Sequence, residues 1–212
     1  MIPGPADLLL VIDVQVDFLP GGALPVPDGD RVVRPINALQ DRFRHVVLTQ
    51  DWHPPGHVSF AASHPGRAPF ETVRLASGDQ TLWPVHCVQG TPGAAFAPGL
   101  ATDRAALILR KGSDPAVDSY SAFLDANRTT RTGLAAALGE RGIRRVVLCG
   151  LATDFCVLWS ALDARAAGFE VVVVEDAVAG IDAPTVPGGS LAEAWARMAA
   201  AGVGRIGAAA FG

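Results

Sequence analysis

The stretch that decides the fold runs from Arg144 to Ala167 and reads RRVVLCGLATDFCVLWSALDARAA. Its first part, Val146–Cys149, is a short β-branched apolar run that ends at Gly150, which predicts a buried strand. Apolar residues then recur at helical spacing, which predicts a helix whose first turn is capped by the side chain of Thr153 or Asp154. We therefore expect a buried strand that turns directly into a helix.

Cys156 falls in the first turn of this expected helix, where backbone N–H groups have no partner within the helix. A thiol there lies near the positive end of the helix dipole, which makes its proton easier to remove. The same N–H groups can stabilise the oxyanion that forms when sulfur attacks a carbonyl carbon. The stretch leaves a second interpretation open, in which Cys156 only packs the start of the helix.

Five other apolar runs have the length of strands. The first shows no alternation of apolar and polar residues, as expected for a strand covered on both faces. These strands are expected at Leu8–Ile12, His45–Thr49, Ala105–Leu109, Glu170–Val174 and Arg205–Ala209. Helices are expected at Val32–Phe43 with Asp30 as its cap, at Thr132–Arg141, and at Ser190–Ala201 with the capping box Ser190–Glu193. The alternation predicts an α/β fold with a doubly wound, mostly parallel six-stranded sheet and helices on both faces.

The composition fits a single domain that spans residues 1–212. Of these residues 50% are apolar, which is enough for a sizeable core. The formal net charge of -4 and the lack of a basic run argue against nucleic acid or an anionic membrane as the main partner, so we expect a small-molecule substrate. Cys87, Cys149 and Cys156 are too few for a disulfide framework and fit a reducing compartment. No signal peptide or membrane span is recognised, and we expect a cytoplasmic protein.

Reactive side chains follow several of the expected strands. Asp13 follows the first strand, Asp51 and His53 the second, Lys111 the third, and Cys156 the strand quoted above. Because these strand ends meet at one edge of a parallel sheet, we expect the side chains to lie together. A carboxylate can take the thiol proton and return it to a leaving group. A nearby ammonium stabilises both the carboxylate and the thiolate. Singly, each has a simpler interpretation: Asp13 can cap a loop, and Lys111 can be a solvated charge.

The histidines gather around Asp51 rather than around the cysteine. Asp51 and His53 stand at a strand end, and His86 lies on a long loop rich in proline, glycine and histidine. One carboxylate and two imidazoles can bind a divalent metal ion such as zinc, iron or manganese and leave positions open for water or substrate. His57 and His64 are further candidates, which can instead shape the loop or support the ligands.

Five segments carry a resemblance to a known family. They read VIDVQVDFLPGG, TQDWHP, WPVHCVQGTPGA, LRKGSDPAVDSYSAF and CGLATDFCV, and DWHP together with WPVHC is the specific part. Over nearly its whole length the chain resembles the pyrazinamidase/nicotinamidase family of the isochorismatase-like cysteine hydrolase superfamily. Related isochorismatases and N-carbamoyl amidohydrolases share the Asp, Lys and Cys positions but generally lack the metal ligands.

The resemblance implies a role for each residue of the expected site. The implied catalytic triad is Asp13, Lys111 and Cys156. The implied oxyanion donors are the N–H groups of Ala152 and Cys156. The implied ligands of one divalent metal, with zinc expected before iron or manganese, are Asp51, His53 and His86. The implied substrate-binding residues are Phe18, Trp83, Tyr120 and Ala152. A cis peptide bond between Leu151 and Ala152 is also implied, and a fourth metal ligand such as His57 stays open.

The activity implied by the resemblance is hydrolysis of nicotinamide to nicotinate and ammonia through a cysteine thioester. This reaction would serve NAD salvage, and pyrazinamide would also be accepted. One alternative is a metal-independent amide or carbamoyl hydrolase of the same superfamily. Another is a protein without catalytic activity that binds a metal or a nicotinamide-like ligand. The sequence leaves the oligomeric state open, with a homo-oligomer as one possibility.

Overall fold

A computed structural model describes residues 1–183 and 188–211. One sheet has the strand order β5-β2-β1-β6-β7-β8, and every neighbouring pair in it is parallel. Its strands are β1 (Asp7–Ile12), β2 (His45–Asp51), β5 (Leu107–Lys111), β6 (Arg145–Leu151), β7 (Glu170–Ala179) and β8 (Gly204–Ile206). The predicted six-stranded doubly wound sheet is confirmed, and its pairing is parallel throughout rather than mostly.

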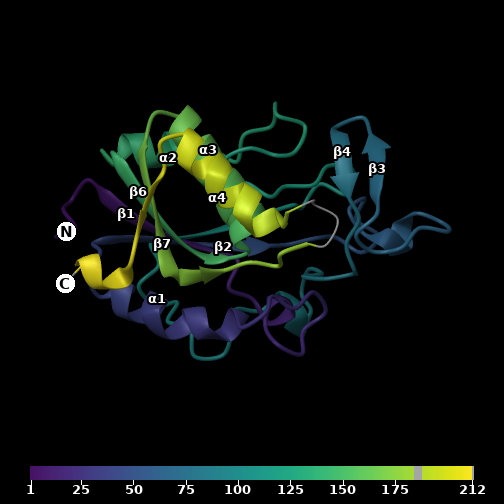
Figure 1. The fold of residues 1–212 in the computed structure, drawn as a ribbon, viewed down its shortest axis with the longest axis horizontal. Coiled ribbons are helices and arrows are strands. Elements are labelled where there is room, and N and C mark those ends of the chain that lie inside the picture. Colours follow the sequence, from purple (N-terminus) through teal and green to yellow (C-terminus); the bar gives the residue numbers. More distant parts are fainter. Residues whose placement is uncertain (184–187, 212) are drawn as a thin grey trace.

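Helices cover both faces of this sheet (Figure 1). They are α1 (Val33–Gln40), α2 (Leu134–Glu140), α3 (Leu158–Ala166) and α4 (Ser190–Ala200). Leu9 and Val11 of β1 pack in one apolar cluster with Ile36 of α1, whereas Leu8 and Leu10 pack in a second cluster with residues of the other three helices. Because both faces are covered, both sets of side chains in β1 must be apolar, which explains its unbroken hydrophobic run.

The long segment between β2 and β5 contains a hairpin and short turns that its sequence pattern does not predict. Strands β3 (Thr72–Leu75) and β4 (Gly78–Thr81) form an antiparallel hairpin at one end of the molecule (Figure 1). Short 3₁₀ turns at Ala61–Ser63 and Pro92–Ala94 also interrupt this segment. The hairpin strands are short and mostly exposed or half-buried, so they lack the apolar run that marks a core strand.

The predicted helix caps are wrong. Residues Thr153–Val157 form a π-helical turn before α3, and no side chain caps that turn; the Asp154 carboxylate bonds instead to the segment after β7. Asp30 lies inside a 3₁₀ turn and does not cap α1. The expected capping box Ser190–Glu193 is absent from the described residues, because Ser190 is already the first residue of α4 and its hydroxyl donates to Asp154.

Several strands end later than expected, and two of these ends matter for the site. β2 continues to Asp51, and β5 is shifted to end at Lys111. The two residues are direct partners in the parallel register of β2 and β5. Asp51 and Lys111 are therefore held by sheet hydrogen bonding and not by a loop. β7 likewise extends to Ala179, while the last strand is only Gly204–Ile206.

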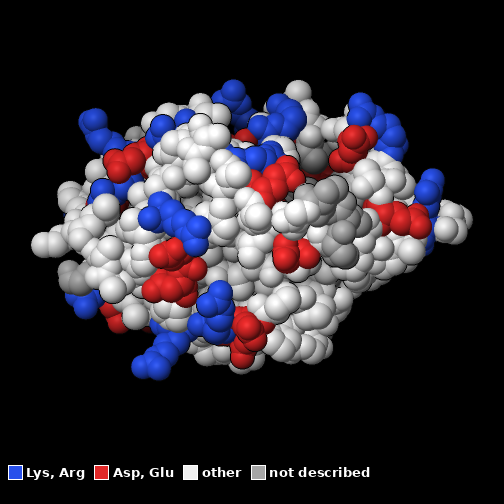
Figure 2. Space-filling model, viewed as in Figure 1, with Lys and Arg blue, Asp and Glu red and all other residues white. Residues whose placement is uncertain are grey.

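The face of the molecule drawn in Figure 2 is not dominated by charge of one sign. On the side shown in Figure 2, basic and acidic side chains are interspersed. In the part of the chain that the structure describes, every helix is too short or too polar to cross a lipid bilayer. The N- and C-termini lie together at the end of the molecule opposite the β3–β4 hairpin (Figure 1).

Candidate active site

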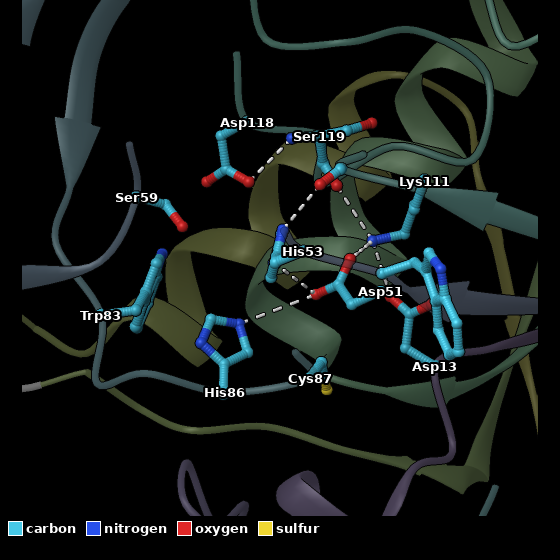
Figure 3. Close-up of polar contacts among 12 residues, drawn as sticks. Asp13, Asp51, His53, Ser59, Trp83, His86, Cys87, Lys111, Asp118 and Ser119 are labelled. Carbon is cyan, nitrogen blue, oxygen red and sulfur yellow. Dashed lines mark hydrogen bonds and ion pairs between the residues drawn. The ribbon is translucent and has the colours of Figure 1, made fainter. Parts of the chain in front are cut away.

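Lys111 is the centre of a buried polar cluster at the carboxyl ends of β1, β2 and β5 (Figure 3). Its ammonium lies 2.8 Å from Asp13 Oδ2, donates to Asp51 Oδ1, and donates to the Ser119 carbonyl at 2.9 Å. Burial by itself would lower the pKa of Lys111, but the charges of Asp13 and Asp51 raise it well above its ordinary value. Lys111 is only 2% exposed, so the interpretation as a solvated surface charge is wrong.

The Cys156 thiol adjoins the same ammonium. Its Sγ lies 3.5 Å from Lys111 Nζ, and a carboxylate oxygen of Asp13 lies within 4.8 Å of it. Burial raises the pKa of the Cys156 thiol well above its ordinary value, although the Lys111 charge opposes this change. The expectation that this thiol loses its proton easily is therefore wrong for the resting site. A neighbouring base must take the proton.

Asp13 is placed to act as that base. The side chain is fully buried, and its Oδ1 accepts a hydrogen bond from the Thr49 hydroxyl at 2.5 Å. Its Oδ2 accepts no well-aligned hydrogen bond from the described residues, although it pairs with the Lys111 ammonium. Burial raises the pKa of Asp13, and Lys111 works against that rise. A carboxyl with a raised pKa and an available oxygen is suited to receive a thiol proton.

Asp51, His53 and His86 form a set of metal-ligand type. Asp51 Oδ2 lies 3.6 Å from His53 Nε2 and 3.8 Å from His86 Nε2. The Nδ1 atoms of the two histidines lie 2.9 Å from the Gly112 carbonyl and 2.8 Å from the Pro84 carbonyl. Because a carbonyl oxygen can only accept, each Nδ1 carries a proton, and the two Nε2 atoms face the carboxylate. This donor set fits a divalent metal ion.

Asp51 belongs to both groups of residues. Burial would raise its pKa, but Lys111 and the histidines bring it well below the ordinary value. One of its oxygens faces the Lys111 ammonium and the other faces the two imidazoles (Figure 3). Burial lowers the pKa of His86 to about 4, so its imidazole is neutral near pH 7 and able to bind a cation. The sequence pattern separates the triad from the ligand set and does not reveal this link.

Gly112 has to be a glycine for this arrangement. Its φ is +66°, and a Cβ there would lie 2.6 Å from Cε1 of His53. The imidazole of His53 thus packs directly against the backbone that follows β5. The peptide N–H of His53 also donates to the Cys87 carbonyl at 3.0 Å, which joins the end of β2 to the segment that carries His86.

The two remaining histidine candidates differ in their surroundings, because His57 also forms a group of metal-ligand type with His53 and Asp118. His57 stacks on His53 with ring centroids 4.2 Å apart, and its Nδ1 lies 2.8 Å from the Ser59 hydroxyl oxygen. His64 Nε2 donates to the Val58 carbonyl at 2.7 Å. His57 therefore supports the ring of His53 and stays a candidate for a fourth ligand, whereas His64 bonds within its own loop.

A mostly apolar cavity opens above these groups. All four residues expected to bind substrate line it, namely Phe18, Trp83, Tyr120 and Ala152. Trp83 donates from its indole N–H to the Tyr120 hydroxyl at 2.9 Å and meets the Phe155 ring edge-on at 4.7 Å. The cavity therefore has aromatic walls, and it is also lined by Cys156, Asp51, His53 and His86. The peptide bond between Leu151 and Ala152 is cis, as the resemblance implies.

Several residues of the site were missed in the sequence. Leu24, Asp118, Phe155 and Ile181 also line the cavity. The Gln15 side chain bonds to both backbone groups of Asp51. The Oε1 of Gln15 accepts from the Asp51 N–H at 2.8 Å, and the Nε2 of Gln15 donates to the Asp51 carbonyl at 2.9 Å. Asp17 accepts from the Cys87 N–H at 2.7 Å. The alternation of Asp13, Gln15 and Asp17 after β1 was the available signal for the last two.

The fold and the site together define an α/β enzyme with a cysteine, an aspartate and a lysine at the carboxyl edge of a parallel sheet. The isochorismatase domain model matches residues 7–205, and the chain belongs to the isochorismatase family. The family resemblance inferred from the sequence is thereby confirmed.

Three relatives show which branch of this family is similar. The nicotinamidase of Acinetobacter baylyi is 51% identical over 198 residues, which cover 93% of this chain and 91% of the relative. The structure of PnC1 from L. infantum in complex with nicotinate is 41% identical, with a TM-score of 0.85 over 99% of this chain and 97% of that one. The structure of the Pyrococcus horikoshii pyrazinamidase in complex with zinc is 37% identical, with a TM-score of 0.75 over 96% and 99%.

Proposed function

We propose that this chain is a nicotinamidase that hydrolyses nicotinamide to nicotinate and ammonia. The observation that carries the proposal is the placement of Lys111, whose ammonium contacts Asp13, Asp51 and Cys156 within one buried cluster. The nucleophile and the candidate metal ligands thus share one aromatic cavity. The similarity to nicotinamidases and to a nicotinate complex supports the substrate, and pyrazinamide is proposed as a second substrate.

In the proposed reaction, Cys156 Sγ attacks the carboxamide carbon while Asp13 Oδ2 takes the thiol proton. The oxyanion lies against the N–H groups of Ala152 and Cys156, and Asp13 gives its proton to the departing ammonia, which leaves a thioester. Asp13 then takes a proton from water as the water oxygen attacks the thioester carbon. Nicotinate departs, and the proton on Asp13 returns to sulfur. The Lys111 ammonium stabilises the Asp13 carboxylate and the Cys156 thiolate throughout the reaction.

Asp51, His53 and His86 would hold one divalent metal ion. We propose zinc before iron or manganese, since the similar pyrazinamidase binds zinc. When bound, this ion supplies a Lewis acid for the pyridine nitrogen, and the nucleophile remains the sulfur. The neutral His86 imidazole and the Gly112 carbonyl behind His53 prepare this donor set within the protein.

Further features of the protein are also proposals. We infer a single domain over residues 1–212, because strands from residue 7 to residue 206 join one sheet. A role in NAD salvage follows from the proposed reaction. The three free cysteines support a cytoplasmic location, and a homo-oligomer stays a prediction.

The test is ammonia release from nicotinamide and from benzamide, before and after removal of metal with a chelator. We expect turnover of nicotinamide that falls on chelation and returns with zinc, and poor turnover of benzamide, which lacks the ring nitrogen. Equal turnover of both amides, unaffected by the chelator, would instead support the metal-independent amide or carbamoyl hydrolase. Nicotinamide binding without ammonia release would support the protein without catalytic activity.

A further inference from the structure

Asp154 is a buried carboxylate that the proposed reaction does not use. It lies in the π-helical turn that also carries Cys156, and it is 4% exposed. Its Oδ1 accepts from the N–H of Ile181 at 3.0 Å, and its Oδ2 accepts from the N–H of Asp182 at 2.9 Å and from the Ser190 hydroxyl at 2.5 Å. Hydrogen bonds to a charged acceptor are stronger than neutral ones, so this carboxylate ties the two segments firmly.

One of the residues held by Asp154 forms part of the substrate cavity. Ile181 lines the cavity together with Phe155 and Cys156. The Ser190 hydroxyl, which donates to Asp154, also accepts from the N–H of Ala183 at 2.7 Å. One carboxylate therefore connects the turn of the nucleophile to the cavity wall that follows β7.

The backbone that follows β7 lies very close to the Asp154 side chain. A Cβ on Gly180 would lie 3.1 Å from Asp154 Oδ1 and 2.6 Å from Cδ1 of Leu191. The backbone just before Ile181 can approach the carboxylate this closely because residue 180 has no side chain. The position of Ile181 is thus determined both by hydrogen bonds and by packing.

We propose that Asp154 is a positioning residue that limits the size of the substrate by holding Ile181 against the cavity. The kinetic part of this inference rests on the proposed nicotinamide hydrolysis. Without the three hydrogen bonds, the backbone at Ile181 and Asp182 moves away from Cys156. The cavity then accepts a carboxamide larger than nicotinamide, and nicotinamide is held less firmly.

The test is Asp154→Asn in the zinc-loaded protein, with nicotinamide and the fused-ring quinoline-3-carboxamide as substrates. Asparagine has the same shape but presents an NH₂ group to at least one of the three donors. We expect KM for nicotinamide to rise about tenfold, equivalent to roughly 1.4 kcal/mol, with kcat within about twofold of the parent. The ratio of kcat/KM for the fused-ring amide over nicotinamide should rise by a similar factor. Hydrogen exchange at the amides of residues 181 and 182 should become faster.

Asp163→Asn is the matched control. Asp163 is also a buried aspartate, on α3, but it pairs with Arg128 at 2.5 and 3.0 Å, and neither residue lines the substrate cavity. This variant should lose stability and keep the selectivity of the parent. Ile181→Ala should reproduce the change in selectivity, and the double variant with Asp154→Asn should add little to it, because both act on one wall.

Ser190→Ala, which removes one of the three donors, gives the same test in a milder form if Asp154→Asn fails to fold. Parent-like selectivity and parent-like exchange at residues 181 and 182 in the folded variant would overturn the proposal. Fully additive effects in the double variant would also overturn it. If the parent releases no ammonia from nicotinamide, the proposed function fails separately; amide exchange then decides alone whether Asp154 positions Ile181.

Discussion

Replacing Lys111 with methionine removes the ammonium that joins Asp13, Asp51 and Cys156. Methionine has a similar length but no charge, so two carboxylates are left facing each other in a buried site. Removing one partner of a buried ion pair costs about 3–5 kcal/mol. For a domain of this size, that corresponds to a fall in Tm of roughly 6–20 °C. The loss of proton transfer through Asp13 should lower kcat by about 10²–10⁴-fold.

The loss of stability should depend on pH in a defined direction. Burial already raises the pKa of Asp13, and Lys111 is the group that opposes this rise. Without Lys111 the folded protein binds a proton at Asp13 more tightly than the unfolded chain does. The stability of the Lys111→Met variant should therefore fall as pH rises from the pKa of the unfolded aspartate to that of the folded one. Urea unfolding of the variant and the parent at several pH values measures this difference.

The reactivity of Cys156 provides the second assay. Because the Lys111 charge opposes the rise in the thiol pKa, the rate of alkylation by iodoacetamide should move to higher pH in the variant. Cys87 and Cys149 are replaced by alanine in both proteins so that one thiol reports. Lys111→Arg should not restore the parent profile, since a planar guanidinium does not fit where a compact ammonium lies between several groups.

The matched control is Arg110→Met, one residue earlier on β5. Arg110 is exposed and stacks over the Trp52 ring at 3.7 Å, so its loss changes charge outside the cluster. This variant should keep the kcat and the alkylation profile of the parent. If Lys111→Met also gave a superimposable profile and an unchanged kcat, Lys111 would have no part in the reaction, and the site would reduce to a cysteine and an aspartate.

Five further substitutions test the remaining parts of the site. Cys156→Ala should abolish ammonia release while metal content stays that of the parent, whereas Cys149→Ala should keep most activity; substantial turnover by the first variant would exclude a thioester. His53→Ala and His86→Ala should each lower metal content, measured by elemental analysis, and raise KM for nicotinamide, and unchanged metal content would disprove the ligand set. Gly112→Ala should destabilise the protein by about 1–2 kcal/mol in urea unfolding, because residue 112 has a positive φ. The variant should also lower metal content, because the new Cβ displaces His53. Parent-like stability and metal content would refute that account.

Much of the site could be found in the sequence because its residues come at or just after the ends of strands. Asp13, Asp51 and Lys111 each stand where an apolar run stops, and parallel strands bring such positions to one edge. Helix starts were harder to predict. Asp30 and Ser190 have side chains that commonly cap helices, yet both are bonded or placed differently here. A cap depends on the backbone angles of one residue, which tertiary contacts decide.

The sequence by itself determined the parallel sheet, the edge at which the reactive side chains collect, and the identity of the candidate nucleophile and metal ligands. Only the tertiary structure decided that Lys111 joins both groups, that Gln15 holds the backbone of Asp51, and that Asp154 reaches Ile181. The physical reason is that these contacts join residues far apart along the chain. They depend on strand register and on the direction of each side chain, whereas local periodicity records only which residues are buried.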